Sequence, residues 1–435
     1  MYDVRDFFLL FSEVFMNLLI KNVLLPEGDK PTVKDIAITD GVITKIGTVG
    51  DDFVADEVID GKNRLAIPAF VNAHTHMYMS TLRNAADDLP FMEWLFNGVM
   101  PKEDRLDGEQ AYWGSLLSCA EMMKRGCATF CDMHLFPGNS ARAAVDCGMR
   151  AVVSRGLVGS EGGQKRLDDQ FKEIEEWKHE KNIKFMLAPH AIYTCDKEYL
   201  LKISDEAKRL GLGLNIHLSE SKAEFNDCMR DNGCTPTEYV ASLGLFENKT
   251  LAAHCVQLTE NDISILAKYG VSVASNPKSN LKLGNGIAPI YQLDKAGVNV
   301  CIGTDSAASN NSLNMFSELN YMTLLHKGTN YDSTAIPAKK AIEFATVNGA
   351  KALGFERLGK LEEGWAADIA LLDTDVPQMI PLRNYYAAVC YCCDGSETDT
   401  LIIDGKVVMK NKELLTIDTE QLYYNINKIV DFLDN

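Results

Sequence analysis

The sequence predicts an α/β protein in which a (β/α)8 TIM-type barrel is inserted into a small β-sandwich domain built from both ends of the chain. Two observations predict this fold class. Eight short apolar runs alternate with amphipathic helical stretches through the middle of the chain, and short β-branched runs separated by turn residues occupy both ends. Strands that alternate with helices predict a parallel sheet, and eight such units predict a closed barrel. A length of 435 residues accommodates one large barrel and one minor domain.

The N-terminal region divides into an appendage and a β-rich unit. Residues 1–15 are expected to be a non-native extension, because residues 16–20 resemble a natural beginning. The apolar run in the extension is too short to span a bilayer and lacks the cleavage site of a signal peptide. Residues 16–68 alternate β-branched runs with turns such as Asp40-Gly41, which predicts the first part of the small β-domain.

The barrel is predicted over residues 69–365. Amphipathic helices separate its strands, and several of these helices end at a glycine, a common C-terminal stop. The eight predicted strand runs are Ala69–Asn72, Ala128–Met133, Ala151–Ser154, Phe185–Pro189, Gly213–His217, Thr250–His254, Val271–Ser275 and Val298–Gly303.

Strand patterns return in residues 366–435, which are expected to complete the small β-domain. Runs at 368–373, 387–390, 400–403 and 406–409 should pair with the N-terminal strands, and residues 419–433 form the pattern of a terminal helix.

Composition limits the classes of partner. The net charge of −18 argues against nucleic acid or an anionic membrane as a partner. The 12 cysteines are scattered along the chain and several lie in apolar runs, which indicates reduced thiols and a cytoplasmic location. The expected partner is a small molecule; the oligomeric state is left open, with a homo-oligomer as one option.

Polar residues at the ends of the predicted strands are the candidates for function, because barrel enzymes place their active sites at the C-terminal face. Five of the chain's 8 histidines fall at such ends. The first two are in the sequence His74-Thr75-His76, whose alternate residues point to the same side of a strand. The candidates at the rim are His74, His76, His190, His217, Glu220, His254 and Asp305.

Bonding preferences suggest roles for these side chains. His74, His76, His217 and Asp305 form a set of three nitrogens and one oxygen suited to one divalent ion, with zinc as the first choice and iron or nickel as alternatives. Such an ion lowers the pKa of a bound water to about 7. Asp305 could also take a proton from that water. Glu220 could shuttle a proton to the substrate, and His254 could orient the water or stabilise a developing anion.

Several motifs resemble those of the amidohydrolase superfamily, over essentially all of residues 16–435. They are Pro68–His76, His217-Leu218-Ser219-Glu220, His254-Cys255, Gly303-Thr304-Asp305 and Gly359–Asp368. Members with two metals carry a lysine at the end of strand four, where this chain has His190. The resemblance therefore implies one metal and deamination of a cyclic amidine, and it disfavours hydrolysis of a cyclic amide.

A finer resemblance is to the 5-methylthioadenosine/S-adenosylhomocysteine deaminases, on residues 82–95 and 101–105. By this resemblance Glu103 accepts hydrogen bonds from the ribose hydroxyls, and His190 contacts the nucleoside. Arg155 and Arg166 match arginines that approach the substrate, and Glu220 and Asp305 also contact it. Read alone, Glu103 would be an acid at the start of a helix. The implied reaction is the hydrolytic deamination of adenine nucleosides.

Three alternatives stay open at this point, one of which, the cyclic-amide hydrolase, is disfavoured by the missing lysine. The substrate could be a free base or a triazine, although Glu103 would then have no ribose to bind. The chain could also be a catalytically silent scaffold, but such relatives usually lose ligands and all four candidate ligands are present.

Overall fold

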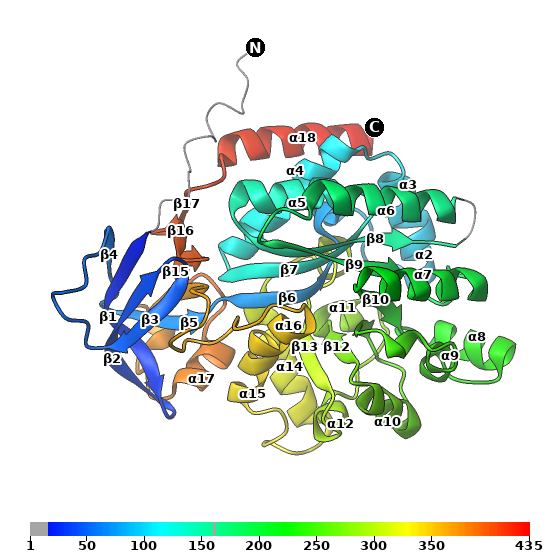
Figure 1. Cartoon of the computed structure of the whole chain (residues 1–435). Coiled ribbons are helices and arrows are strands. Elements are labelled where there is room, and N and C mark those ends of the chain that lie inside the picture. The colour runs from blue at the N-terminus through cyan, green and yellow to red at the C-terminus, as the bar shows by residue number, and fades with distance from the viewer. Residues whose placement is uncertain (1–15, 160–161) are drawn as a thin grey trace, which may run out of the picture.

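The structure, a computed structural model, describes residues 16–159 and 162–435. Residues 1–15, for which the sequence predicted a non-native extension, lie outside the described residues. Two sheets organise the fold (Figure 1). One has eight parallel strands and the other has nine strands from the two ends of the chain, so the predicted fold class is confirmed.

The barrel sheet has the order β13-β12-β11-β10-β9-β8-β7-β6, so each strand pairs with its neighbour in the sequence. All eight predicted runs are strands, displaced by at most a few residues. They are β6 (Phe70–Thr75), β7 (Cys127–His134), β8 (Arg150–Leu157), β9 (Ile183–Pro189), β10 (Gly213–Leu218), β11 (Thr250–His254), β12 (Ser272–Ser275) and β13 (Asn299–Ile302).

Helices surround these strands because their apolar faces pack on the outside of the sheet. Helix α7 shows how capping residues set the ends of these helices. The Asp196 side chain accepts from the Tyr199 amide at its start, and Gly211 adopts a left-handed conformation at its end. The longer helices are α4 (Gly108–Met123), α5 (Pro137–Cys147), α6 (Gly163–Trp177), α7 (Lys197–Leu210), α8 (Lys222–Asn232), α10 (Glu260–Tyr269), α14 (Met315–Thr329) and α18 (Thr419–Asp434).

Shorter helical pieces fill the connections. They are η1 (Met77–Leu82), α2 (Phe91–Glu93), η2 (Trp94–Val99), α3 (Met100–Glu103), α9 (Pro236–Ser242), η3 (Leu245–Glu247), α11 (Pro277–Lys282), α12 (Ile290–Lys295), α13 (Ala307–Asn310), α15 (Ala338–Phe344), α16 (Val347–Ala352), η4 (Pro377–Met379), α17 (Tyr385–Ala387) and η5 (Ala388–Cys392). The run 387–390, predicted as a strand, is therefore helical. Its apolar side chains pack into the main core, where burial alone does not distinguish a short strand from a helix.

The barrel closes where the end of β13 meets β6. The Thr304 amide donates to Asn72 Oδ1 at 3.0 Å, and Asn72 Nδ2 donates to Thr304 Oγ1 at 2.7 Å. The next amide, of Asp305, donates to the His74 carbonyl at 2.9 Å. A side chain at Gly303 would lie 2.8 Å from the His74 backbone nitrogen, so only glycine permits this approach.

The second sheet has the order β17-β16-β15-β14-β5-β1-β2-β3, with β4 paired to β1. N-terminal β5 is antiparallel to C-terminal β14, which joins the two ends of the chain. The strands are β1 (Asn17–Glu27), β2 (Lys30–Thr39), β3 (Val42–Gly47), β4 (Glu57–Asp60), β5 (Arg64–Pro68), β14 (Ile369–Asp373), β15 (Thr398–Ile403), β16 (Lys406–Lys410) and β17 (Glu413–Leu414).

A buried ion pair fastens this sheet to the barrel. Arg150, at the start of β8, binds both carboxylate oxygens of Asp368, with Nε 2.8 Å from Oδ2 and Nη2 3.1 Å from Oδ1. The same guanidinium reaches Asp404 at 2.9 Å, and Asp368 is 3% exposed. None of the helices in the described ranges combines the length with the apolarity that a bilayer span requires.

Removing the charge of Asp368 should destabilise the protein strongly, because Arg150 would stay buried with an incomplete set of partners. We expect Asp368→Asn to lower the free energy of unfolding by about 3 kcal/mol, measured by urea denaturation. The matched control is Glu175→Gln, which removes an exposed ion pair with Lys178 and should cost less than about 1 kcal/mol. Equal effects of the two substitutions would contradict the fastening role of Asp368.

Candidate active site and metal centre

The C-terminal ends of the barrel strands surround a cavity of about 340 Å³. This volume is at the lower end of the range for small-molecule sites. The structure brings most of the candidate residues to its wall. Those that line it are His76, Glu103, Arg166, His190, His217, Glu220, His254 and Asp305.

His74 lies beneath the cavity and is fully buried, with its ring centroid 5.0 Å from that of His76 and 4.9 Å from that of His217. Both of its ring nitrogens are buried without a hydrogen-bond partner among the described residues. Burial holds the pKa of His74 well below its ordinary value, so the ring is neutral and has a free lone pair. A buried imidazole of this kind fits a metal ligand.

His76 and His217 are oriented by backbone carbonyls. His76 Nδ1 donates to Met133 O at 2.7 Å, and His217 Nδ1 donates to His190 O at 2.9 Å. Because a carbonyl accepts from Nδ1 in each ring, Nε2 is the nitrogen that faces the other candidate ligands, the arrangement typical of metal-binding histidines.

The remaining distances fit one ion. The Nε2 atoms of His76 and His217 are 3.3 Å apart, and Asp305 Oδ1 is 3.3 Å from His76 Nε2 and 3.7 Å from His74 Nε2. Ligand atoms in a tetrahedral zinc shell lie about 3.4 Å apart, since each is about 2.1 Å from the ion. The donor set and its spacing therefore fit one divalent metal ion.

Asp305 is held so that one oxygen stays available. Its Oδ2 accepts from Ser279 Oγ at 2.5 Å and from Ser309 Oγ at 2.8 Å, which leaves Oδ1 facing the histidines. The backbone of Asp305 has a φ of 61°, in the left-handed region, as do Ser219 and His254 at the ends of two other strands. Such strain is typical of functional sites, where surrounding contacts enforce the conformation.

Glu220 is 6% exposed and lies opposite His254, with Oε2 3.8 Å from His254 Nε2. Its other oxygen accepts from Asn285 Nδ2 at 3.0 Å. Burial raises the pKa of the Glu220 carboxyl above its ordinary value, which favours a form that can donate a proton. His254 Nδ1 lies 2.8 Å from Asn280 Oδ1 and 3.3 Å from Asn276 Nδ2; the shorter contact, to an acceptor, places the proton on Nδ1 and leaves Nε2 as an acceptor.

Glu103 approaches the cavity from α3, outside the barrel strands. Its carboxylate has no hydrogen-bond partner among the described residues, although it lines the wall. Burial raises the pKa of Glu103 to about 7, with the charge of His76 opposing the shift and that of Asp104 adding to it. His190 lies at the same wall, and burial lowers its pKa to about 4.

The two arginines differ in placement. Arg166 lines the cavity and donates to Val158 O at 3.3 Å. Arg155 instead binds Glu173 of α6, with Nε 3.2 Å from Oε2, and also donates to the carbonyl of Leu135. It is not among the residues that line the cavity, so its predicted contact with substrate stays a prediction.

Sequence reasoning missed the polar residues that hold the candidate catalytic groups. Ser279, Asn280 and Asn285 all come from one segment that follows β12, and each bonds a rim side chain. The signal was the density of serine and asparagine after the seventh strand, which is also typical of a turn. Aromatic side chains of the segment after β6 were also missed: Phe91 and Trp94 stack at 6.1 Å and line the cavity.

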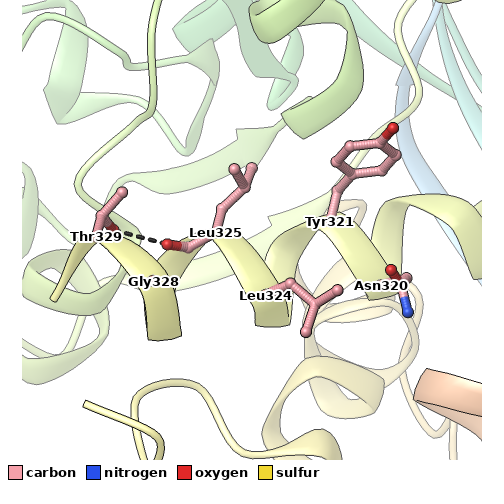
Figure 2. A pocket seen from close by; sticks show the side chains of 6 residues that line it. All are labelled: Asn320, Tyr321, Leu324, Leu325, Gly328 and Thr329. Atoms are coloured by element: carbon pink, nitrogen blue, oxygen red, sulfur yellow. Dashed lines mark hydrogen bonds between the residues drawn. The ribbon is translucent and has the colours of Figure 1, made fainter. Parts of the chain in front are cut away.

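A second hollow, of about 520 Å³, lies on the outer surface of α14 (Figure 2). Its lining contains no acid, histidine or cysteine; it comprises Asn320, Tyr321, Leu324, Leu325, Gly328 and Thr329. It therefore lacks groups for acid–base or metal chemistry, and the rim cavity is the candidate active site.

Known proteins resemble this chain along nearly its whole length. A sequence model of the amidohydrolase family matches residues 65–408. A 5-methylthioadenosine/S-adenosylhomocysteine deaminase of Thermoanaerobacter pseudethanolicus is 43% identical over 95% of this chain and 98% of its own. A 5′-deoxyadenosine deaminase of Methanocaldococcus jannaschii is 41% identical over 96% of this chain and 99% of its own. The crystal structure of an adenosine deaminase from Xanthomonas campestris with bound zinc matches with a TM-score of 0.92 and 31% identity, covering 96% of this chain and 99% of its own.

The metal set can be tested by metal analysis. We expect His76→Ala to reduce bound zinc from about one equivalent per chain to about a tenth of that, because one of four ligands is lost. The control is His134→Ala, since His134 is another buried histidine of the rim whose Nδ1 accepts from the Phe136 amide. Comparable loss of metal in both variants would contradict the assignment.

Proposed function

This chain belongs to the amidohydrolase family, and we propose that it is a metal-dependent deaminase that removes ammonia from the adenine ring of nucleosides by hydrolysis. The substrates are 5′-methylthioadenosine, S-adenosylhomocysteine and adenosine, and the products are the inosine analogues. The observation that carries the proposal is one cavity that brings candidate metal ligands together with a buried acid, Glu220, and a second carboxylate, Glu103. The ligand atoms of His74, His76 and Asp305 lie within 4.8 Å of one another, as do those of His74, His217 and His254. Relatives above 40% identity that bear the names of adenine nucleoside deaminases support it.

His74, His76, His217 and Asp305 would hold one divalent ion, which we propose is zinc. The bound ion would lower the pKa of a water so that hydroxide is available at neutral pH.

Glu220 is the general acid of the proposed reaction. Its Oε1 is occupied by Asn285, so Oε2 is the oxygen that delivers a proton to a ring nitrogen of adenine. Protonation of the ring makes C6 more electrophilic, and water adds there. Glu220 and Asp305 then take the two protons of the water: one reaches the amino group, which leaves as ammonia, and the other restores the acid form of Glu220.

His254 orients the attacking water. Because Asn280 fixes the proton of His254 on Nδ1, its Nε2 can accept a hydrogen bond from that water. The sequence left two roles open for His254, orienting the water and stabilising a developing anion, and this tautomer favours orienting the water. Asp305 Oδ1, which the two serines leave unoccupied because they hold Oδ2, would both contact the ion and take a proton from the water.

Glu103 binds the ribose. A single carboxylate can accept from two neighbouring hydroxyls, and Glu103 has both oxygens available. His190 contacts the nucleoside from the wall beside it. Arg166 approaches the 5′ substituent, where a guanidinium suits an amino-acid carboxylate, and Arg155 is assigned to the same region by family resemblance alone.

The alternative substrates fit the site less well. A free base or a triazine has no hydroxyl pair for Glu103 to bind. A cyclic amide would call for the lysine of two-metal relatives, and this chain has His190 directly after β9.

Turnover of nucleosides by the metal-loaded protein tests the function. We expect 5′-methylthioadenosine, S-adenosylhomocysteine or adenosine to be converted to the hypoxanthine product, followed by the change in ultraviolet absorbance and by release of ammonia. The variant Glu220→Gln should lower kcat by a factor of about 10² to 10⁴ and retain the metal, because it removes only the proton donor.

Absence of turnover with every adenine nucleoside would refute the function. Loss of metal together with activity in Glu220→Gln would instead place Glu220 among the metal ligands.

The pH dependence of KM tests Glu103. Because its pKa is raised to about 7, the acceptor form is lost as the pH falls through 7. KM for adenosine should therefore rise below pH 7, whereas KM for 2′,3′-dideoxyadenosine, which lacks both hydroxyls, should not follow it. In Glu103→Gln the KM for adenosine should be higher by about tenfold and no longer respond to pH between 6 and 8. An unchanged pH profile in that variant would contradict the role of Glu103.

A further inference from the structure

We propose that the C-terminal end of helix α18 clamps the short helix α3 and so positions Glu103 for binding the ribose. Lys102 and Arg105 are then positioning residues for the substrate, although they lie outside the cavity. The inference rests on the proposed function in one respect, namely that Glu103 is the carboxylate that binds the ribose.

The two cations bind the last carbonyls of α18. Arg105 Nη1 donates to Leu433 O at 3.1 Å and Nη2 donates to Phe432 O at 2.5 Å. Lys102 Nζ lies 2.6 Å from Asp434 Oδ1 and 3.4 Å from Leu433 O. The last carbonyls of a helix lack partners within the helix and carry the negative end of its dipole, so cations bind there favourably.

The Arg105 guanidinium also lies over the ring of Phe432, 4.7 Å from its centroid. A cation over an aromatic face adds attraction to the hydrogen bonds. Arg105 thus contacts α18 through two carbonyl groups and one aromatic ring. Together these contacts fix both the distance and the orientation of α18 relative to the segment that carries Arg105.

Apolar side chains of α18 support the same wall from behind. Ile429 and Leu433 are buried in one cluster with Tyr78, Met79 and Trp94. The last three also line the cavity. Helix α18 lies over α4 beside α3 (Figure 1), so the end of the chain covers the back of the substrate wall.

The clamped segment cannot hold its shape by itself. It consists of α2 with 3 residues, η2 with 6 and α3 with 4, and helices of this length are unstable in isolation. None of the residues of α3 is fully buried, and Glu103 is half-buried at the cavity wall. The carboxylate of Glu103 has no hydrogen bond of its own among the described residues, so its position depends on the neighbours that bind α18.

Two measurements on Arg105→Ala test the clamp. We expect amide hydrogen exchange in residues 91–106 to become several-fold faster, because the segment loses its contacts with α18. We also expect kcat/KM for adenosine to fall about tenfold, through KM, while that for 2′,3′-dideoxyadenosine changes less than about twofold. Lys102→Gln should show the same two changes to a smaller degree. It replaces Arg105→Ala in both measurements if that variant does not fold.

The matched control is Arg142→Ala. Arg142 also stacks on an aromatic ring, with its guanidinium 3.7 Å from the centroid of Tyr112, and pairs with Glu109 at 2.9 Å, but it does not contact the segment 91–106. It should leave both exchange in that segment and discrimination between the two nucleosides unchanged.

The exchange measurement needs no catalysis, so the clamp can fail independently of the proposed function. Unchanged exchange in both Arg105→Ala and Lys102→Gln would overturn the clamp. Faster exchange with unaltered discrimination against the dideoxynucleoside would overturn the positioning of Glu103. Equal losses of kcat/KM with both nucleosides would also overturn the positioning of Glu103, because α18 would then support the cavity wall without affecting selectivity for the ribose.

Discussion

The contact between the first and last strands of the barrel is the constraint on which the site depends. The amide of Asp305 binds the carbonyl of His74, and the paired side chains of Asn72 and Thr304 hold the same junction one residue deeper. Because Gly303 permits this approach, an aspartate from the end of the barrel reaches two histidines from its beginning. Metal coordination tolerates errors of only a few tenths of an ångström in ligand position. The contacts that close the barrel therefore also bring the candidate metal ligands together.

Two carboxyl groups at different positions around the rim follow the same physical pattern. In Asp305 two serine hydroxyls occupy Oδ2, and in Glu220 an asparagine amide occupies Oε1, so the other oxygen of each group faces a histidine of the rim. Fixing one oxygen removes rotational freedom from the other without using its lone pairs. Such groups need little reorganisation during proton transfer, which is how a rigid site lowers a barrier. The donors come mainly from the segment after β12, a strand that itself contributes no ligand.

The barrel and the rim histidines could be predicted from the sequence because both follow from local patterns. Apolar runs that end in histidine mark buried strands and their exposed ends, and parallel strands end on one face. The residues that hydrogen-bond the candidate catalytic groups could not be predicted, because Asn285 and Ser279 resemble ordinary turn residues in the sequence. Arg155 shows the converse difficulty. Resemblance to the family assigned it to the substrate, and in the structure Glu173 on the following helix binds it; which residues of a helix face a strand is not encoded locally. The prediction of a strand at 387–390 was wrong because a short, mostly apolar run does not by itself distinguish a strand from a helical turn.

Chemistry and recognition have different structural sources in this protein. The metal set and the proton-transfer groups come from barrel strands and their loops, whose positions are limited by closure of the sheet. Glu103 and the aromatic wall come from the segment between β6 and α4, which closure does not constrain. A segment of short helices can bind substrate specifically only if something else fixes it, since its own hydrogen bonds are too few. The fold meets this requirement with α18, which follows the strands of the second sheet in the chain and ends against α3. On the proposed roles of Glu103 and α18, the second sheet bears on substrate recognition through the helix it leads into, even though none of its described strands lines the cavity.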